Sequence, residues 1–174
     1  YLKINERKST IFREKLKDVA HEKIIGISWK STTKIDKGIN LSLERFLLGI
    51  YSPKLKFICL QYGDVEKEIV QLRKKHGIKI EIINEVDLFN DIDGLAALIS
   101  ACDEVVSIDN ITLHLAGAIG IKTNILLPKN CHWYHGENDK KSYWFPTVNF
   151  FRQKKINEWD IPLKEIKNEI KINN

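Results

Sequence analysis

The strongest chemical signal in the chain lies where a short β-branched run stops at Asp109 and a helix of small residues begins at once. Such a junction leaves backbone N–H groups at the positive end of a helix dipole. Phosphates and other anions bind at these ends. Asp109 is placed to cap the helix, because its carboxylate can accept from the N–H of Ile111 or Thr112. We therefore expect an anion-binding turn over 109–112.

Other polar residues follow other apolar runs. Lys30 comes directly after the first of these runs, and its ammonium can meet phosphate oxygens. Gln61 ends the second and can both donate and accept hydrogen bonds. His114 lies one turn into the helix and shares a face with Asn110, which places these two side chains within reach of each other. Each also has a simpler interpretation as a solvated, capping or buried polar group.

The elements that must position these residues alternate along the chain. Hydrophobic periodicity predicts strands over 24–29, 55–61, 78–83, 104–108, 123–127 and 148–151. It predicts helices over 9–22, 41–49, 64–76, 93–101, 111–119 and 161–172. Ser9 and Thr10 open the first helix, Gly77 ends the third, and Asp91 or Asp93 caps the fourth. This order indicates an α/β domain, a Rossmann-like parallel sheet of about six strands with helices on both faces.

The carboxyl ends of such strands form the ligand-binding edge. The residues expected at this edge are Ser28, Trp29, Lys30, Gln61 and Tyr62, together with 84–91, 109–112 and 128–132. The connection over 30–40 is long for a strand-to-helix loop, which favours a functional role. Residues 129–146 are irregular and aromatic-rich, and Trp133, Trp144 and Phe145 are expected to pack locally rather than stack on RNA.

Composition narrows the class of protein. A length of 174 residues with 43% hydrophobic and 29% charged residues fits one globular domain. No apolar run is long enough to span a bilayer, and residues 1–23 lack the apolar core of a signal peptide. The net charge of +5 comes from lysines scattered among glutamates, so no nucleic-acid partner is expected. Three cysteines without metal-type spacing favour the reducing cytoplasm.

The chain has no methionine, so we expect it to be part of something longer. Residues 1–23 are then a helix or linker from an upstream region, and 24–174 form the domain. No histidine has an acidic residue or a cysteine at the spacing typical of metal ligands, so no metal is expected. The first strand-to-helix turn reads Lys30-Ser31-Thr32-Thr33 and holds no GxGxxG pattern, which argues against an NAD enzyme.

Several segments in order resemble one family. They are Ile27-Ser28-Trp29-Lys30, Cys59-Leu60-Gln61, Leu95-Ala96-Ala97-Leu98-Ile99, Val106-Ser107-Ile108-Asp109, His114-Leu115-Ala116-Gly117-Ala118, Leu126-Leu127-Pro128, Tyr143-Trp144-Phe145-Pro146 and Phe151-Arg152-Gln153. Over about 24–170 the chain resembles the C-terminal, nucleotide-sugar-binding half of a GT-B glycosyltransferase, of the heptosyltransferase or tetratricopeptide-repeat-linked type. The resemblance implies metal-independent transfer from a UDP- or ADP-type nucleoside diphosphate sugar, without a further cofactor.

The resemblance also implies roles for particular residues. The phosphate-binding turn falls on Asp109, Asn110, Ile111 and Thr112, the supporting basic residue on Lys30, and the strand-end glutamine near the nucleotide on Gln61. His114 matches the helix histidine of the family, and Ser28 and Trp29 lie in the strand end beside Lys30. The catalytic base and the acceptor site belong to the other half of the fold, so the catalytic residues stay unknown. The implied partner is that N-terminal half, or a repeat domain of the parent chain.

Two departures from the family pattern keep other functions open. Asn110 stands where the family has a phosphate-binding Thr or Ser, and the loop after the first strand has Lys34 and Lys37 but no arginine. Both departures suit a non-catalytic binding or assembly module that keeps the half-fold. A nucleotide-sugar epimerase of the same architecture is a third candidate, disfavoured because no acidic pair lies near the cleft.

Overall fold

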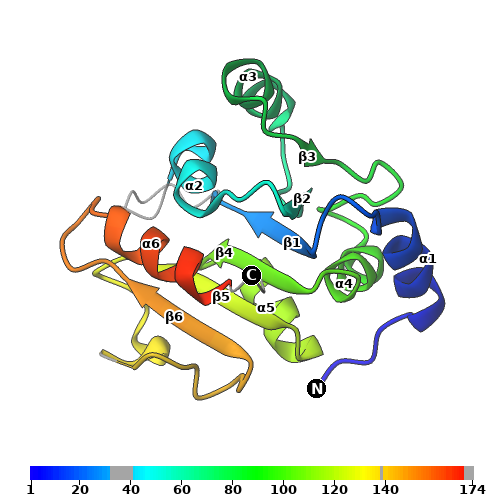
Figure 1. The fold of residues 1–174 in the computed structure, drawn as a ribbon. Helices are drawn as coiled ribbons and strands as arrows, with labels where there is room; N and C mark the ends of the chain where they lie inside the picture. Colours follow the sequence, from blue (N-terminus) through cyan, green and yellow to red (C-terminus); the bar gives the residue numbers. More distant parts are fainter. Residues whose placement is uncertain (32–40, 138, 171–174) are drawn as a thin grey trace.

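The computed structural model describes residues 1–31, 41–137 and 139–170. Within these ranges six strands form one parallel sheet in the order β3-β2-β1-β4-β5-β6 (Figure 1). The strands are β1 Lys23–Ser28, β2 Leu55–Cys59, β3 Ile80–Glu81, β4 Glu104–Ile108, β5 Lys122–Leu127 and β6 Val148–Arg152. The helices are α1 Glu6–Leu16, α2 Leu43–Ile50, α3 Glu66–His76, α4 Ile92–Ser100, α5 Ile111–Ile119 and α6 Asp160–Glu169. The predicted Rossmann-like sheet is confirmed.

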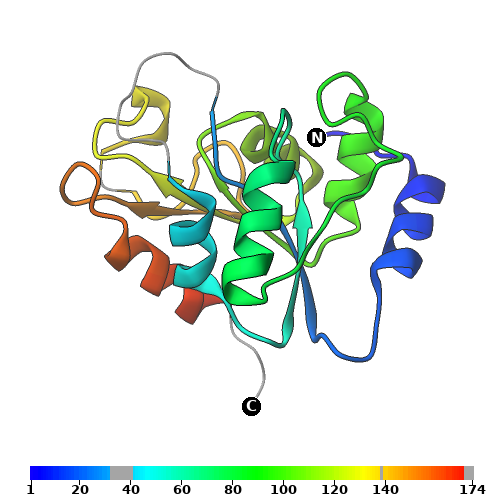
Figure 2. The same cartoon turned by 90° about the horizontal axis from the view of Figure 1, so that it is seen from above.

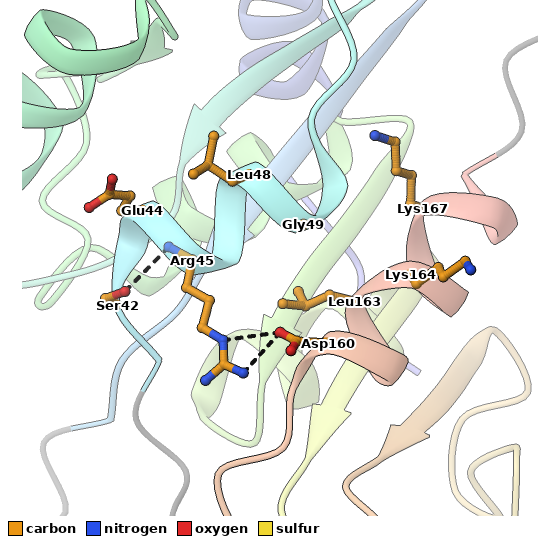
Figure 3. Close-up of a pocket in the computed structure, with 9 residues that line it drawn as sticks. All are labelled: Ser42, Glu44, Arg45, Leu48, Gly49, Asp160, Leu163, Lys164 and Lys167. Carbon is orange, nitrogen blue, oxygen red and sulfur yellow. Dashed lines mark hydrogen bonds and ion pairs between the residues drawn. The ribbon is translucent and has the colours of Figure 1, made fainter.

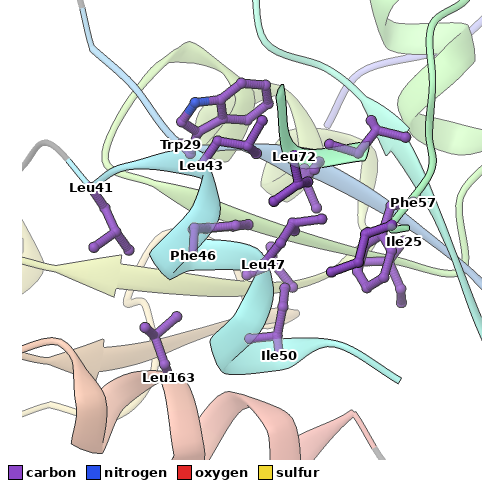
Figure 4. Packing of buried hydrophobic residues seen from close by; sticks show 14 of the residues in the cluster. Ile25, Trp29, Leu41, Leu43, Phe46, Leu47, Ile50, Phe57, Leu72 and Leu163 are labelled. Atoms are coloured by element: carbon purple, nitrogen blue, oxygen red, sulfur yellow. The ribbon is translucent and has the colours of Figure 1, made fainter. Parts of the chain in front are cut away.

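Helices cover both faces of the sheet, as the alternation of elements predicts. On one face α2 lies beside α6 and also contacts α3, and on the other α1 lies beside α4, which contacts α5 (Figures 1 and 2). The first face buries the larger cluster, in which Phe46 and Leu47 of α2 meet Ile25 and Phe57 of the sheet (Figure 4). Gly49 lets α6 come close, because a Cβ there would lie 2.8 Å from Leu163 Cβ.

Most element boundaries follow their local signals. The Asp91 carboxylate accepts from Gly94 N at 2.8 Å and starts α4, and Gly77 ends α3 in the left-handed region at φ 71°. Helix α5 runs from Ile111 to Ile119 as predicted, and Gly120 ends it at φ 90°. The predicted helix end at 171–172 lies outside the described residues.

The first helix and the third strand differ from the prediction. Helix α1 begins after Asn5, whose side chain accepts from Lys8 N at 3.1 Å, and not at Ser9 and Thr10. It ends at Leu16, because Asp18 accepts from the backbone N–H of Ala20 and of His21 and turns the chain toward β1. Strand β3 is only two residues long, and it lies at one edge of the sheet, where it pairs with β2 alone.

Candidate functional site at the carboxyl edge of the sheet

The carboxyl edge brings five of the predicted site residues into one polar cluster: Ser28, Trp29, Lys30, Gln61 and Asn110. The Gln61 side-chain oxygen accepts from Ser28 Oγ at 3.0 Å, Trp29 N at 2.9 Å and Lys30 N at 2.8 Å. Asn110 donates from Nδ2 to Ser28 Oγ at 2.8 Å and to Lys30 O at 3.2 Å. Neutral amides thus lock the end of β1 to the starts of the two loops beside it.

Asn110, and not Asp109, caps helix α5. Its side-chain oxygen accepts from Thr112 N at 3.0 Å and from Ser107 Oγ at 3.1 Å, and its backbone oxygen accepts from Leu113 N at 3.2 Å. The expected Asp109 cap is therefore wrong. Both residue types are good caps, so local sequence does not rank them. The Asn110 amide turns toward β1 rather than toward His114.

The Asp109 carboxylate turns instead toward the segment after β5. Its Oδ2 lies 3.0 Å from His135 Nε2, and the side chains are 6% and 3% exposed. The contact lacks hydrogen-bond geometry, and among the described residues Nε2 has no hydrogen-bond partner. His135 is a residue that the sequence reasoning missed, because 26 positions separate it from Asp109 and no local pattern links them.

Lys30 is held by a partner that the sequence also did not indicate. Its ammonium forms an ion pair with Glu68 of α3, whose second oxygen accepts from Trp29 Nε1 at 3.2 Å. The Trp29 ring is fully buried in the core, so this residue offers the edge only its backbone. Lys30 remains 37% exposed, at one end of a hollow of about 680 Å³ between α2 and α3.

The residues at the start of α5 differ in accessibility. Ile111 is exposed, whereas Thr112 is fully buried. Among the described residues the Thr112 hydroxyl has no hydrogen-bond partner. A buried polar atom without a partner costs free energy and is typical of places where a ligand or a water supplies it. This hydroxyl lies two positions after the residue where the resemblance places one.

His114 lies against the aromatic segment that follows β5. Its ring contacts those of Tyr134 and Phe145 at centroid distances of 6.2 and 6.3 Å. Burial lowers the pKa of the imidazole, the Asp109 charge opposes that shift, and His135 and His132 add to it. The neutral form of His114 is therefore favoured in the fold.

An aromatic groove lies beside the carboxyl edge, along α5. It has a volume of about 940 Å³ and is lined by Tyr1, Leu2, His114, Leu115, Ala118, Trp133, Tyr134, Trp144 and Phe145. Trp133 is 86% exposed and Trp144 58%, but both make the expected local contacts: the Trp133 ring meets that of Tyr134 at 6.0 Å between centroids, and Trp144 Nε1 donates to Tyr134 O at 3.3 Å. Phe145 also packs locally, and it explains Gly117, where a Cβ would lie 2.5 Å from Phe145 Cγ.

Another groove, between α2 and α6, lies outside this edge. The Arg45–Asp160 pair crosses one end of it at 2.9 Å, while Lys164 and Lys167 point to solvent (Figure 3). In the part of the chain that the structure describes, no group of three or more His, Cys, Asp or Glu side chains could hold a metal ion. Within the same ranges, no helix has both the length and the apolar character needed to cross a membrane.

Comparison with known proteins places the fold. No family model matches the chain. Protein FlbA of Caulobacter vibrioides is 31% identical over 139 residues, which are 78% of this chain and 23% of FlbA. The chain thus spans less than a quarter of that curated relative.

Three solved structures share the architecture. A glycosyl transferase family 9 protein from Veillonella parvula superposes with a TM-score of 0.62 at 16% identity, over 88% of this chain and 42% of its own. ADP-heptose lipopolysaccharide heptosyltransferase II of Escherichia coli superposes with a TM-score of 0.62 at 12% sequence identity. The match covers 97% of this chain and 51% of the heptosyltransferase. The E. coli heptosyltransferase WaaC, solved with ADP-2-deoxy-2-fluoro heptose, superposes with a TM-score of 0.56 at 16% sequence identity. The match covers 93% of this chain and 46% of WaaC. The chain therefore has a Rossmann-like, glycosyltransferase-like fold that matches about half the length of each of these proteins.

Proposed function

We propose that the chain is the donor-binding domain of a metal-independent glycosyltransferase that uses a nucleoside diphosphate sugar. The observation that carries this proposal is that Lys30 and the start of α5 lie together at the carboxyl edge of the sheet. The domain that contains this sheet has the fold of solved glycosyltransferases. In parallel α/β sheets ligands bind at this edge. WaaC, one of these neighbours, was solved with an ADP-sugar analogue, so we propose an ADP- or UDP-type donor.

The proposed chemistry is stabilisation of a leaving group. When the sugar bond breaks, negative charge builds up on the departing nucleoside diphosphate. Preorganised donors and a nearby cation stabilise that charge in the transition state. Lys30 supplies the cation, and the Ile111 N–H with the Thr112 hydroxyl supplies donors at the helix start. Gln61 and Asn110 hold the backbone of Lys30 in place.

We further propose that the acceptor site and the catalytic base lie in another part of the parent protein, so no catalytic residue is assigned. The extent of the structural match supports this proposal, because the chain spans about half of each solved neighbour. The partner is then an N-terminal Rossmann-like half or a repeat domain. The three free cysteines suit the reducing cytoplasm.

A non-catalytic binding module is the second candidate, and the exposed aromatic groove favours it. Large apolar patches on the surface mark interaction sites, and Trp and Tyr are enriched in binding hot spots. The resemblance places a phosphate-binding hydroxyl at position 110. The Asn110 side chain that stands there instead caps α5 and donates to Ser28. The two functions differ in whether a nucleoside diphosphate binds at the carboxyl edge.

Calorimetric titration with ADP, UDP and their sugars tests the proposal. We expect wild type to bind at least one, and Lys30→Ala to bind it about tenfold more weakly or worse, because a charge-assisted bond is worth roughly 1.5–3 kcal/mol. Glu68→Gln acts in the opposite direction, since it frees the ammonium of Lys30 from its ion pair. The gain is up to about fivefold, given the roughly 0.2–1 kcal/mol of an exposed pair.

Lys54→Ala is the matched control. Lys54 also pairs with a glutamate, Glu22, at 2.7 Å, but at the opposite edge of the sheet. Its loss should leave nucleotide affinity unchanged. Failure of wild type to bind any of these nucleotides, or equal affinity of the Lys30 and Lys54 variants, contradicts the proposed site.

A further inference from the structure

The pair of Asp109 and His135 has no part in the proposed function so far, although it lies directly beside the helix start. Asp109 immediately precedes the α5 cap, and its carboxylate is almost fully buried. Burial raises the pKa of the nearby Tyr134 hydroxyl, and the Asp109 charge adds to that shift. The negative charge of Asp109 therefore acts on the groups around the start of α5.

The chain holds His135 in place through Arg152, at the end of β6. The guanidinium donates to His135 O at 2.5 Å, to Asp139 O at 3.2 Å and to Cys131 Sγ at 2.9 Å. It also lies over the Phe150 ring, 5.3 Å from its centroid. These contacts fasten the segment after β5 to the edge strand of the sheet. The His135 ring is further wedged between Tyr134 and Phe150, at centroid distances of 4.4 and 5.0 Å.

A buried carboxylate next to an anion site works against that site. Two like charges repel more strongly in a protein interior than in water, because the dielectric response is weaker. An imidazole in contact with the carboxylate removes most of this repulsion when it carries a proton. It also turns the carboxylate toward the segment after β5, away from the N–H groups that Asp109 would otherwise cap.

We propose that His135 is a positioning residue that neutralises Asp109 beside the start of α5, and that this pair sets the affinity of the edge for a diphosphate. The proposal rests on the proposed function. It assigns a role to the aromatic segment after β5, since Arg152 and Tyr134 keep the imidazole against the carboxylate. Asp109 then contributes to nucleotide binding through its partner and is not itself a phosphate ligand.

A double-mutant cycle with Asp109→Asn and His135→Gln tests this role. The readouts are calorimetric affinity for ADP, UDP and inorganic pyrophosphate at about pH 6, below the ordinary pKa of an imidazole, and the free energy of unfolding. His135→Gln leaves the carboxylate without its cation, and we expect about tenfold weaker binding. Adding Asp109→Asn should restore affinity to within about threefold of wild type, while the stability stays lowered.

Asp109→Asn alone covers the case in which the His135 variant does not fold. Since it removes the buried negative charge that His135 is proposed to neutralise, affinity should not fall more than about threefold below wild type. Asp103→Asn is the matched control, because Asp103 is a partly buried carboxylate that pairs with Arg13 at the opposite edge. This control should lose stability and keep its affinity.

The outcomes separate the two proposals. If wild type binds none of the three probes, the proposed function and the role of His135 both fail. If wild type binds and the second substitution fails to restore affinity, His135 is only structural and the proposed function stands. A tenfold loss of affinity in Asp109→Asn alone makes Asp109 a direct ligand, which also overturns the role of His135.

Discussion

The two edges of the sheet use charge in different ways. At the amino edge, ions pair with several partners: Glu104 accepts from Lys23 at 2.7 Å and from Asn124 at 3.2 Å, and lies 3.4 Å from Lys122. At the carboxyl edge, neutral groups fill the centre. Among the described residues, Lys30 and His135 each have a single acidic partner there.

This difference indicates which edge can exchange partners. A buried charge held by several groups is costly to disturb, since removing one leaves the others desolvated and unpaired. Lys30 is partly exposed and has one acidic partner, so its ammonium can turn to an incoming anion at little cost, whereas His135 is buried. We therefore expect the amino edge to be structural and the carboxyl edge to be the one that binds ligands.

The largest expected effect is at the amino edge. Glu104→Ala removes a carboxylate that is 4% exposed and leaves the ammonium groups of Lys23 and Lys122 without their shared partner. We expect a loss of about 3 kcal/mol in the free energy of unfolding, and no change in nucleotide affinity. Urea unfolding measures the first and calorimetry the second. Glu169→Ala, which removes the exposed partner of Lys122, is the control and should cost less than about 1 kcal/mol.

If Glu104→Ala lowers the free energy of unfolding by less than about 1 kcal/mol, the ion pairs of the amino edge contribute no more to stability than a surface ion pair does. A change in nucleotide affinity there would show that the two edges are coupled. Either result breaks the contrast between them.

A smaller effect is expected at the centre of the carboxyl edge, from Asn110→Asp. The variant keeps a capping oxygen for Thr112 N, but it loses the donations to Ser28 Oγ and Lys30 O. Two lost hydrogen bonds cost about 1–2 kcal/mol of stability. The new negative charge should also weaken nucleotide binding, and Asn110→Thr, which is uncharged, should bind more tightly than the Asp variant. Equal affinity of the two variants would place the phosphates away from this turn.

Much of the fold was predictable because its signals are local. Gly120 and the β-branched run before Asp109 define α5 to the residue, and the cap at Asp91 was one of two that the sequence allowed. The clustering of Ser28, Lys30, Gln61 and Asn110 was predictable, since the carboxyl ends of parallel strands meet at one edge. The charged pairs at this edge were not, because Glu68 and His135 reach Lys30 and Asp109 across 38 and 26 positions that no short-range pattern connects.

The smallest expected effect is a dependence of stability on pH, which differs between the edges. At the carboxyl edge, burial lowers the pKa of His114 from 6.5, so the folded state binds its proton less readily than the unfolded state. The neutral imidazole therefore makes its whole contribution to the free energy of unfolding above about pH 6.5, and this contribution is lost as the pH falls below that value. At the amino edge, the hydrogen bond from His21 lowers the pKa of Asp18 from 3.8 to about 2. That contribution is full above about pH 4 and is lost as the pH falls toward 2.

The two windows do not overlap, so one pair of variants separates the edges. His114→Gln should flatten the stability profile between about pH 6.5 and 5 and leave the acid limb intact. Asp18→Asn should flatten only the limb below about pH 4. Urea unfolding across this range measures both. A His114→Gln profile that parallels wild type between pH 6.5 and 5 would mean that the ring takes up its proton as easily in the fold as in the unfolded chain. The aromatic segment would then not shield α5 from water, and Asp109 and His135 would lie in a wetter site than their burial indicates.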